Sequence, residues 1–221
     1  MSGTAHLLII AAAVAISSVP ILTTILILLS PNRSRSAVPF LIGWVVGIAL
    51  TVSAASLVAQ VLPTSRTDRQ PDTAVGIAEI VVGAAVVLLG IVSFFRRRRG
   101  GTARTSRLAG VEGKLGPSSA LGLGFILNLR PKGILLAMAG GLTLYADATS
   151  FQSYVLQWGL YTLVASTTVA LPIIVAAASP DRMQPRLVAV HEWLTLRGGV
   201  ITSGVLAVVG ILIMGMGIGR L

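Results

Sequence analysis

Six long apolar runs constrain what this chain can fold into more than any other feature of its sequence. The runs cover residues 6–29, 37–62, 74–95, 119–144, 153–178 and 199–219. Each is long enough to cross the hydrocarbon core of a bilayer as a helix, which takes about 20 residues. Isolated strands are excluded because lipid offers their backbone no hydrogen-bond partners. The sequence therefore predicts an all-α polytopic membrane protein with six transmembrane helices.

The first run is predicted to be a retained helix rather than a secretory signal. It has no basic segment before it, since the first Lys or Arg is Arg33, and no clear A-x-A cleavage site follows. The chain also has no cysteine, so disulfides and thiolate metal sites are excluded, and neither a metal nor a cofactor is expected.

The distribution of basic residues predicts the orientation. The connections after the first, third and fifth runs carry 12 of the 17 Lys and Arg residues, whereas the opposite side carries 3. The positive-inside rule places the richer side in the cytoplasm. We therefore expect a multi-pass protein of the cytoplasmic (inner) membrane with both termini outside.

Four consecutive arginines, Arg96 to Arg99, begin a basic connection over residues 96–118. We interpret them chiefly as a topogenic signal, with contact to anionic membrane lipids as the alternative. Nucleic acid is not an expected partner, because this connection has no interleaved aromatic residues on which bases could stack.

An internal repeat divides the chain into residues 1–95 and 119–221, with three runs in each. Pro20 matches Pro131 near the middle of the first and fourth runs, and Trp44 in "FLIGWVVG" matches Trp158 in "YVLQWGLY". "LLGIV" at 88–92 also matches "VVGIL" at 208–212. Because each half has an odd number of spans, the second half is predicted to be inverted relative to the first.

The two prolines predict interrupted helices that meet near the bilayer midplane. Proline removes a backbone donor and frees carbonyls, and such discontinuous helices build the substrate sites of secondary transporters. A simple kink at Pro20 is the alternative. Hydroxyls flank these positions and either line a polar path or bond back to their own helices; those near Pro20 are Ser17, Ser18, Thr23 and Thr24, and those before Pro172 are Ser166, Thr167 and Thr168.

Two cations lie beside the second proline, in "NLRPK". Charge inside a bilayer costs roughly 2.5–3.5 kcal/mol on insertion scales and is expected to face protein or water. We therefore predict that Arg130 and Lys132 attract an anionic group on a substrate, with snorkelling to the surface as the alternative. The predicted substrate-binding residues are Ser17, Ser18, Pro20, Thr23, Asn128, Arg130, Pro131 and Lys132.

Glu79 is the other charge well within a run. We predict that it pairs with Arg130 and is a candidate for proton coupling, or else that it lies in the outer head-group region. Asp147, in "YADATS", is expected to be a solvated loop acid.

The segment before the last run, "SPDRMQPRLVAVHEWLTLRGG", has Leu187, Val190 and Leu194 at helical spacing. This pattern predicts an amphipathic helix on the cytoplasmic membrane surface. Its "HEWLT" misses the metalloprotease motif because Thr195 replaces the second histidine. No nucleophile elbow is present either, so an enzyme is not expected.

These motifs resemble those of the lysine exporter (LysE-type) superfamily, with "SSVP" for its first Pro-containing motif and "NLRPK" for its second. The resemblance is closest to the GAP-like, peptidoglycolipid-addressing (sulfolipid-addressing) proteins, in "ILLSPNRSRSAVPFLIGWVVG" and "WLTLRGGVITSGVLAVVGILIMGMGIG". It implies export of small or amphiphilic molecules related to envelope glycolipids.

The resemblance implies an exporter that works by alternating access. The alternatives are an accessory factor that assists a larger lipid exporter, and an amino-acid exporter. This chain has one proline where amino-acid exporters have Pro-Gly-Pro, and two residues separate Asn128 from Pro131. A homodimer is also possible, because "GMGIG" offers small residues for packing.

Overall fold

Each predicted run is helical in the computed structural model, as one helix or as two, over the residues that the structure describes. It describes residues 3–60, 73–98, 116–178 and 180–221, and no strand occurs within these ranges. The helices are α1 (Gly3–Ala15), α2 (Ser18–Leu29), α3 (Arg33–Ala59), α4 (Thr73–Arg98), α6 (Pro117–Asn128), α7 (Pro131–Asp147), α8 (Phe151–Ala178) and α9 (Pro180–Ile218). The all-α prediction is confirmed. Most of the predicted basic connection at 96–118 lies outside the described residues.

The first and fourth runs are both interrupted, as predicted. Helices α3, α4, α8 and α9 are each long and apolar enough to cross a membrane. Helices α1 and α2 bend by 49° at their junction, and α6 and α7 bend by 64°. Counting each bent pair as one span gives up to six spans.

The first break lies before Pro20 rather than at it. Helix α1 ends at Ala15, Ser17 has extended backbone angles, and α2 begins at Ser18. Pro20 is therefore the third residue of α2, where its missing N–H would have no partner within the helix in any case. Pro131 similarly opens α7 as its first residue.

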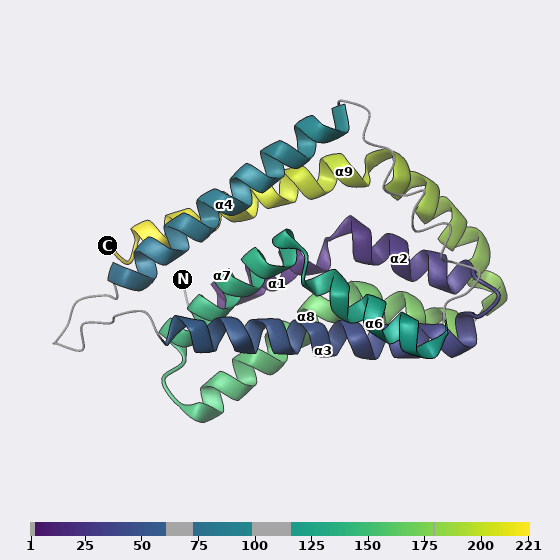
Figure 1. Ribbon diagram of the computed structural model, residues 1–221, viewed down its shortest axis with the longest axis horizontal. Helices are drawn as coiled ribbons and strands as arrows, with labels where there is room; N and C mark the ends of the chain where they lie inside the picture. Colours follow the sequence, from purple (N-terminus) through teal and green to yellow (C-terminus); the bar gives the residue numbers. More distant parts are fainter. Residues whose placement is uncertain (1–2, 61–72, 99–115, 179) are drawn as a thin grey trace.

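The predicted surface helix and the last run form one continuous helix, α9, instead of two. Figure 1 shows that α9 changes direction between its olive first half and its yellow second half. Leu187 and Leu194 are buried as part of the core, whereas Val190 is 43% exposed. The apolar face of this segment thus packs partly against protein, and no helix break separates it from the last run.

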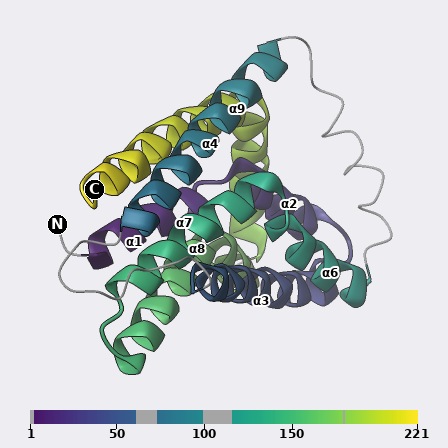
Figure 2. The same cartoon turned by 60° about the vertical axis from the view of Figure 1, so that its left-hand side comes forward.

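The helices form three groups. Helix α4 and the second half of α9 lie on one side, α3 and α6 on the other, and α1 and α2 lie between them (Figure 1 and Figure 2). Both ends of the chain lie at one end of the bundle, together with the end of α7 (Figure 1). We call this the termini end.

Helices α4 and α9 pack through small residues at seven-residue intervals. A Cβ added at Gly76 would lie 2.8 Å from the carbonyl oxygen of Gly217, and one at Gly83 would lie 2.7 Å from that of Gly210. A Cβ added at Gly90 would lie 3.2 Å from the carbonyl oxygen of Ser203. Only glycine allows such close backbone approach. Gly217 belongs to "GMGIG", so part of that motif packs within the chain; a homodimer stays a prediction.

Candidate substrate cavity

Both helix breaks line one cavity of about 900 Å³. Seven of the eight predicted binding residues contribute to its wall: Ser17, Ser18, Pro20, Asn128, Arg130, Pro131 and Lys132. Thr23 does not; it is buried, and its hydroxyl donates to the carbonyl of Val19 at 2.9 Å. The structure thus brings together two segments that are more than a hundred residues apart in the sequence.

Hydroxyls from two other helices satisfy the first break. The hydroxyl of Thr168 in α8 donates to the carbonyl oxygen of Ala15 at 2.7 Å, where α1 ends. The hydroxyl of Thr202 in α9 accepts from the Ser18 N–H at 3.4 Å and donates to the Ser18 hydroxyl at 2.9 Å. These side chains take the place of the intrahelical bonds lost at the break. Sequence reasoning included Thr168 among the candidate polar residues but missed Thr202.

The amide side chain of Asn128 lies at the second break and bonds to two backbone carbonyls. Asn128, the last residue of α6, is buried and donates from Nδ2 to the carbonyl oxygens of Gly124 (3.1 Å) and Trp44 (3.3 Å). Arg130 follows in an extended conformation with φ −70° and ψ 151°, and α7 begins at Pro131. A Cβ at Gly133 would lie only 2.3 Å from the Asn128 carbonyl oxygen. The turn therefore requires glycine at this position.

Three donors in the cavity-lining residues have no hydrogen-bond partner in the described part of the chain. They are Lys132 Nζ, Trp44 Nε1 and the Ser203 hydroxyl, and all three atoms are buried. Trp44 is only 3% exposed and Ser203 only 6%. Buried donors without acceptors are costly. An anionic oxygen would satisfy them, and the N-terminal end of α7 at Pro131 and Lys132 favours negative charge as well. Sequence reasoning used Trp44 only to align the repeat.

The rest of the wall is mostly apolar. Aliphatic side chains from α2, α4 and α9 contribute to it: Leu22, Leu26, Leu89, Val92, Leu194 and Leu206. A cavity lined by both cationic donors and aliphatic side chains fits a molecule that has an anionic group joined to an apolar body.

The remaining predicted hydroxyls bond mainly within their own helices, which confirms that alternative for them. Thr24 donates to the Pro20 carbonyl at 2.8 Å, and Thr167 donates to the Leu163 carbonyl at 2.9 Å. Ser166 bonds in the same way to Thr162. Such bonds satisfy a hydroxyl in lipid without building a polar path.

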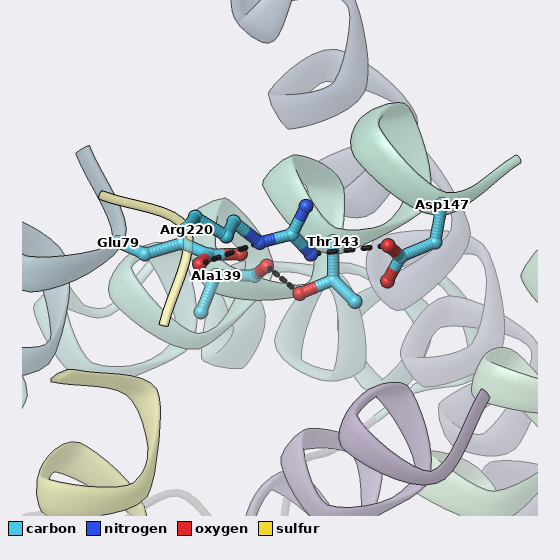
Figure 3. Close-up of polar contacts among 5 residues, drawn as sticks. All are labelled: Glu79, Ala139, Thr143, Asp147 and Arg220. Atoms are coloured by element: carbon cyan, nitrogen blue, oxygen red, sulfur yellow. Dashed lines mark hydrogen bonds and ion pairs between the residues drawn. The ribbon is translucent and has the colours of Figure 1, made fainter. Parts of the chain in front are cut away.

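Glu79 does not pair with Arg130, contrary to the prediction. Its Oε2 lies 3.1 Å from Nε of Arg220, and Nη2 of Arg220 lies 3.1 Å from Oδ1 of Asp147 (Figure 3). The three residues come from α4, from the turn after α9 and from the end of α7. Arg220 lies 141 positions from Glu79 in the sequence, so no local pattern indicates this pair.

The expectation that Asp147 is a solvated loop acid was wrong, because Asp147 is ion-paired with Arg220. Glu79 is buried within the protein at 1% exposure, and its level relative to the head groups stays a prediction. Neither acid lines the cavity. The chain therefore has two separate polar centres: the cavity at the breaks, and an ion cluster at the termini end.

Comparison with known proteins assigns the chain to a family. The family model described as "Sap, sulfolipid-1-addressing protein" matches residues 7–219, which is nearly the whole chain. The chain belongs to this family. The description names an addressing role and no enzymatic activity. Neither the curated proteins nor the solved structures contain a match.

Membership of the family confirms the resemblance to sulfolipid-addressing membrane proteins. Together with the apolar helices, it gives the chain a lipid-related role at a membrane. The relationship to the wider LysE-type superfamily stays a prediction.

Proposed function

We propose that this protein exports an anionic amphiphile, related to envelope glycolipids, from the cytoplasmic side of the membrane by alternating access. The observation that supports this most directly is the cavity itself. Two broken helices meet there, unpartnered donors including the Lys132 ammonium are buried in its wall, and aliphatic side chains continue that wall. Arg130 and Lys132 would hold the anionic group, while the aliphatic side chains would hold the apolar part.

The helix contacts support an inverted three-plus-three repeat. Helix α3 packs against α6, and the equivalent helix of the other half, α8, packs against α1. Helix α4 packs against α7, and the equivalent helix of the other half, α9, packs against α2. Helices α4 and α9 also pack against each other. Exchanging the two halves reproduces each of these pairings. A repeat of this kind lets one half rock against the other around a central site.

Some pairings depart from this two-fold pattern, and the one between the two broken helices suggests the conformational state. Helix α1 packs against α7 towards the termini end, but the equivalent pair α2 and α6 is not among the closely packed pairs. If the basic connections lie in the cytoplasm, the termini end lies outside. The structure would then be closed outside and parted inside, which is the state that receives a substrate from the cytoplasm.

Reconstituted vesicles would test transport directly. We expect the full chain to speed the transbilayer movement of a fluorescent anionic lipid over that of a zwitterionic lipid with the same tails, measured with a membrane-impermeant quencher. The Arg130→Gln, Lys132→Met double variant should lose on the order of tenfold or more, since a hydrogen bond to a charged group contributes about 1.5–3 kcal/mol. The control is Arg186→Gln, Arg197→Gln, at two exposed arginines of α9. Equal rates in the double variant and the control would contradict the proposal.

The family description favours a second candidate, an accessory factor that addresses lipid to a larger exporter. Such a factor would dock through its basic connection and would not need the buried cations. It would show no lipid movement in vesicles. In cells, neutralising Arg96 to Arg99 would abolish lipid delivery while Lys132→Met would leave it unchanged. An amino-acid exporter would instead move a small amino acid and neither lipid.

A further inference from the structure

The ion cluster of Glu79, Asp147 and Arg220 lies apart from the cavity and joins three helices at the termini end. Arg220 uses two different nitrogens for the two acids, Nε for Glu79 and Nη2 for Asp147, each at 3.1 Å (Figure 3). One guanidinium thus links α4 to α7 and holds the end of α9 against both.

Close backbone packing positions the arginine. A Cβ at Gly76 would lie 3.2 Å from Cβ of Arg220, and one at Gly217 would lie 2.5 Å from the Gly76 carbonyl oxygen. Because Gly76 is about one helical turn before Glu79, this crossing brings the arginine directly over the carboxylate. The arrangement depends on two glycines that touch no other part of the cluster.

The cluster has too few positive charges and hydrogen-bond donors for its two carboxylates. Two carboxylates share one guanidinium, and Glu79 Oε1 and Asp147 Oδ2 have no hydrogen-bond donor among the described residues. His6 of α1 is the other titratable side chain in electrostatic range of Asp147 and Arg220. Glu79 is 1% exposed, so water cannot replace a missing partner. Without Arg220, an ionised Glu79 would be a buried, unpaired charge.

We propose that Glu79, with Asp147 beside it, is a proton-binding site at which a proton and Arg220 replace each other. In the closed state the carboxylate of Glu79 is ionised and paired with Arg220. When the guanidinium leaves, still charged, for the water at the termini end, a proton from that water binds the Glu79 carboxylate and cancels its charge. The exchange leaves the buried Glu79 without an unpaired charge in either state, and Asp147, whose side chain is 22% exposed, can turn to water when Arg220 leaves.

The role of this exchange rests on the proposed function, because it would couple transport to the binding of a proton. Releasing Arg220 removes the ion pairs that connect α4, α7 and the end of α9, which would make it easier for the termini end to open when the halves rock. Acid on that side would favour the released state by supplying the proton. Export would then be coupled to the proton gradient through Glu79 and not through the cations of the cavity.

Infrared spectroscopy of the purified full chain tests the site without any substrate. At neutral pH we expect no protonated-carboxyl band in the wild type and a new one in Arg220→Gln. That band should disappear in the Arg220→Gln, Glu79→Gln double variant and be absent from Arg220→Lys, which keeps the cation. Arg197→Gln, at an exposed arginine, is the matched control. An Arg220→Gln variant with no new band would overturn the proposal.

If Arg220→Gln fails to fold, the double variant keeps the test decisive. Removing both charges leaves no unpaired charge at the buried Glu79 position, and Asp147 is partly exposed in both variants. Arg220→Gln, Glu79→Gln should therefore be recovered as folded protein in greater yield than Arg220→Gln alone. A double variant recovered no better than the single one would contradict the exchange.

Opening of the termini end can be followed with a thiol probe, because the chain has no cysteine of its own. Thr143 of α7 lies beside Arg220 and is 2% exposed (Figure 3). We expect Thr143→Cys to react severalfold faster with a membrane-impermeant maleimide as the pH falls, after correction for thiol ionisation. Adding Glu79→Gln should make that rate independent of pH. Neither the infrared test nor the thiol test measures lipid movement. A failure of the proposed proton site can therefore be distinguished from a failure of the proposed transport function.

Discussion

The two helix breaks line the same cavity but are built from different chemistry. The first, between α1 and α2, is neutral, and hydroxyls from α8 and α9 complete it. At the second, between α6 and α7, the Asn128 side chain bonds to Gly124 in its own helix and to Trp44 in α3. This break also carries Arg130 and Lys132. Both breaks therefore use hydrogen bonds to other helices, but the first uses neutral hydroxyls, whereas the second brings charge into the cavity. We infer that the first is mainly a structural joint and the second mainly a ligand site.

The largest expected effect is at the turn of the second break. Gly133→Ala would place a Cβ 2.3 Å from the Asn128 carbonyl oxygen, which must move. We expect a loss of about 3 kcal/mol in the free energy of unfolding, at the upper end for overpacking. Gly122→Ala, in α6, is the control, because a Cβ there has no neighbour within 4 Å. Thermal unfolding in detergent measures both, and equal melting temperatures would show that the turn adapts.

Removing the hydroxyls that complete the first break should have a smaller effect. Thr168→Val leaves the Ala15 carbonyl without its donor, and Thr202→Val leaves the Ser18 N–H without its acceptor. Each should cost about 1–2 kcal/mol of stability, as hydrogen bonds between membrane helices do. Thr167→Val is the matched control, because that exposed hydroxyl bonds within α8. If all three variants unfold alike, the first break does not depend on distant helices.

Neutralising the second break should change stability in the opposite direction. Lys132→Met removes a buried ammonium that has no hydrogen-bond partner. We expect the ligand-free protein to gain about 1 kcal/mol. Added anionic lipid should raise the melting temperature of the wild type more than that of the variant, because a ligand stabilises the state it binds. A destabilised Lys132→Met would mean that the ammonium is already paired.

The smallest effect is expected from the two tryptophans that the predicted repeat would relate. Trp158 Nε1 donates to the Ser53 hydroxyl at 3.0 Å, whereas Trp44 Nε1, beside the second break, has no partner. Trp158→Phe should cost about 1 kcal/mol of stability. Trp44→Phe should be close to neutral for stability but should weaken anionic-lipid binding severalfold. Identical behaviour of the two variants would argue against a ligand-binding role for Trp44.

The sequence alone determined the class of the protein, its helices and the two interruptions. Runs of about 20 apolar residues can only be helices in lipid, and proline favours an interruption because it removes a backbone donor, although Pro39, Pro172 and Pro185 lie inside continuous helices. The predicted repeat related Pro20 to Pro131 and led to the prediction that both breaks would meet. The class, the helices and the interruptions are local properties, and residues in one segment are enough to determine them.

Tertiary structure alone decided which groups satisfy one another. Thr202 completes α2 from 184 residues away, and Arg220 instead of Arg130 pairs with Glu79. Tertiary structure also determined that α1 ends at Ala15 and that α9 continues without a break through the predicted surface helix. Hydrogen bonds and ion pairs act over a few ångströms, so their partners depend on which helices pack together. In this chain that packing depends on glycines whose close contacts, such as Gly76 with Gly217, become evident only in three dimensions.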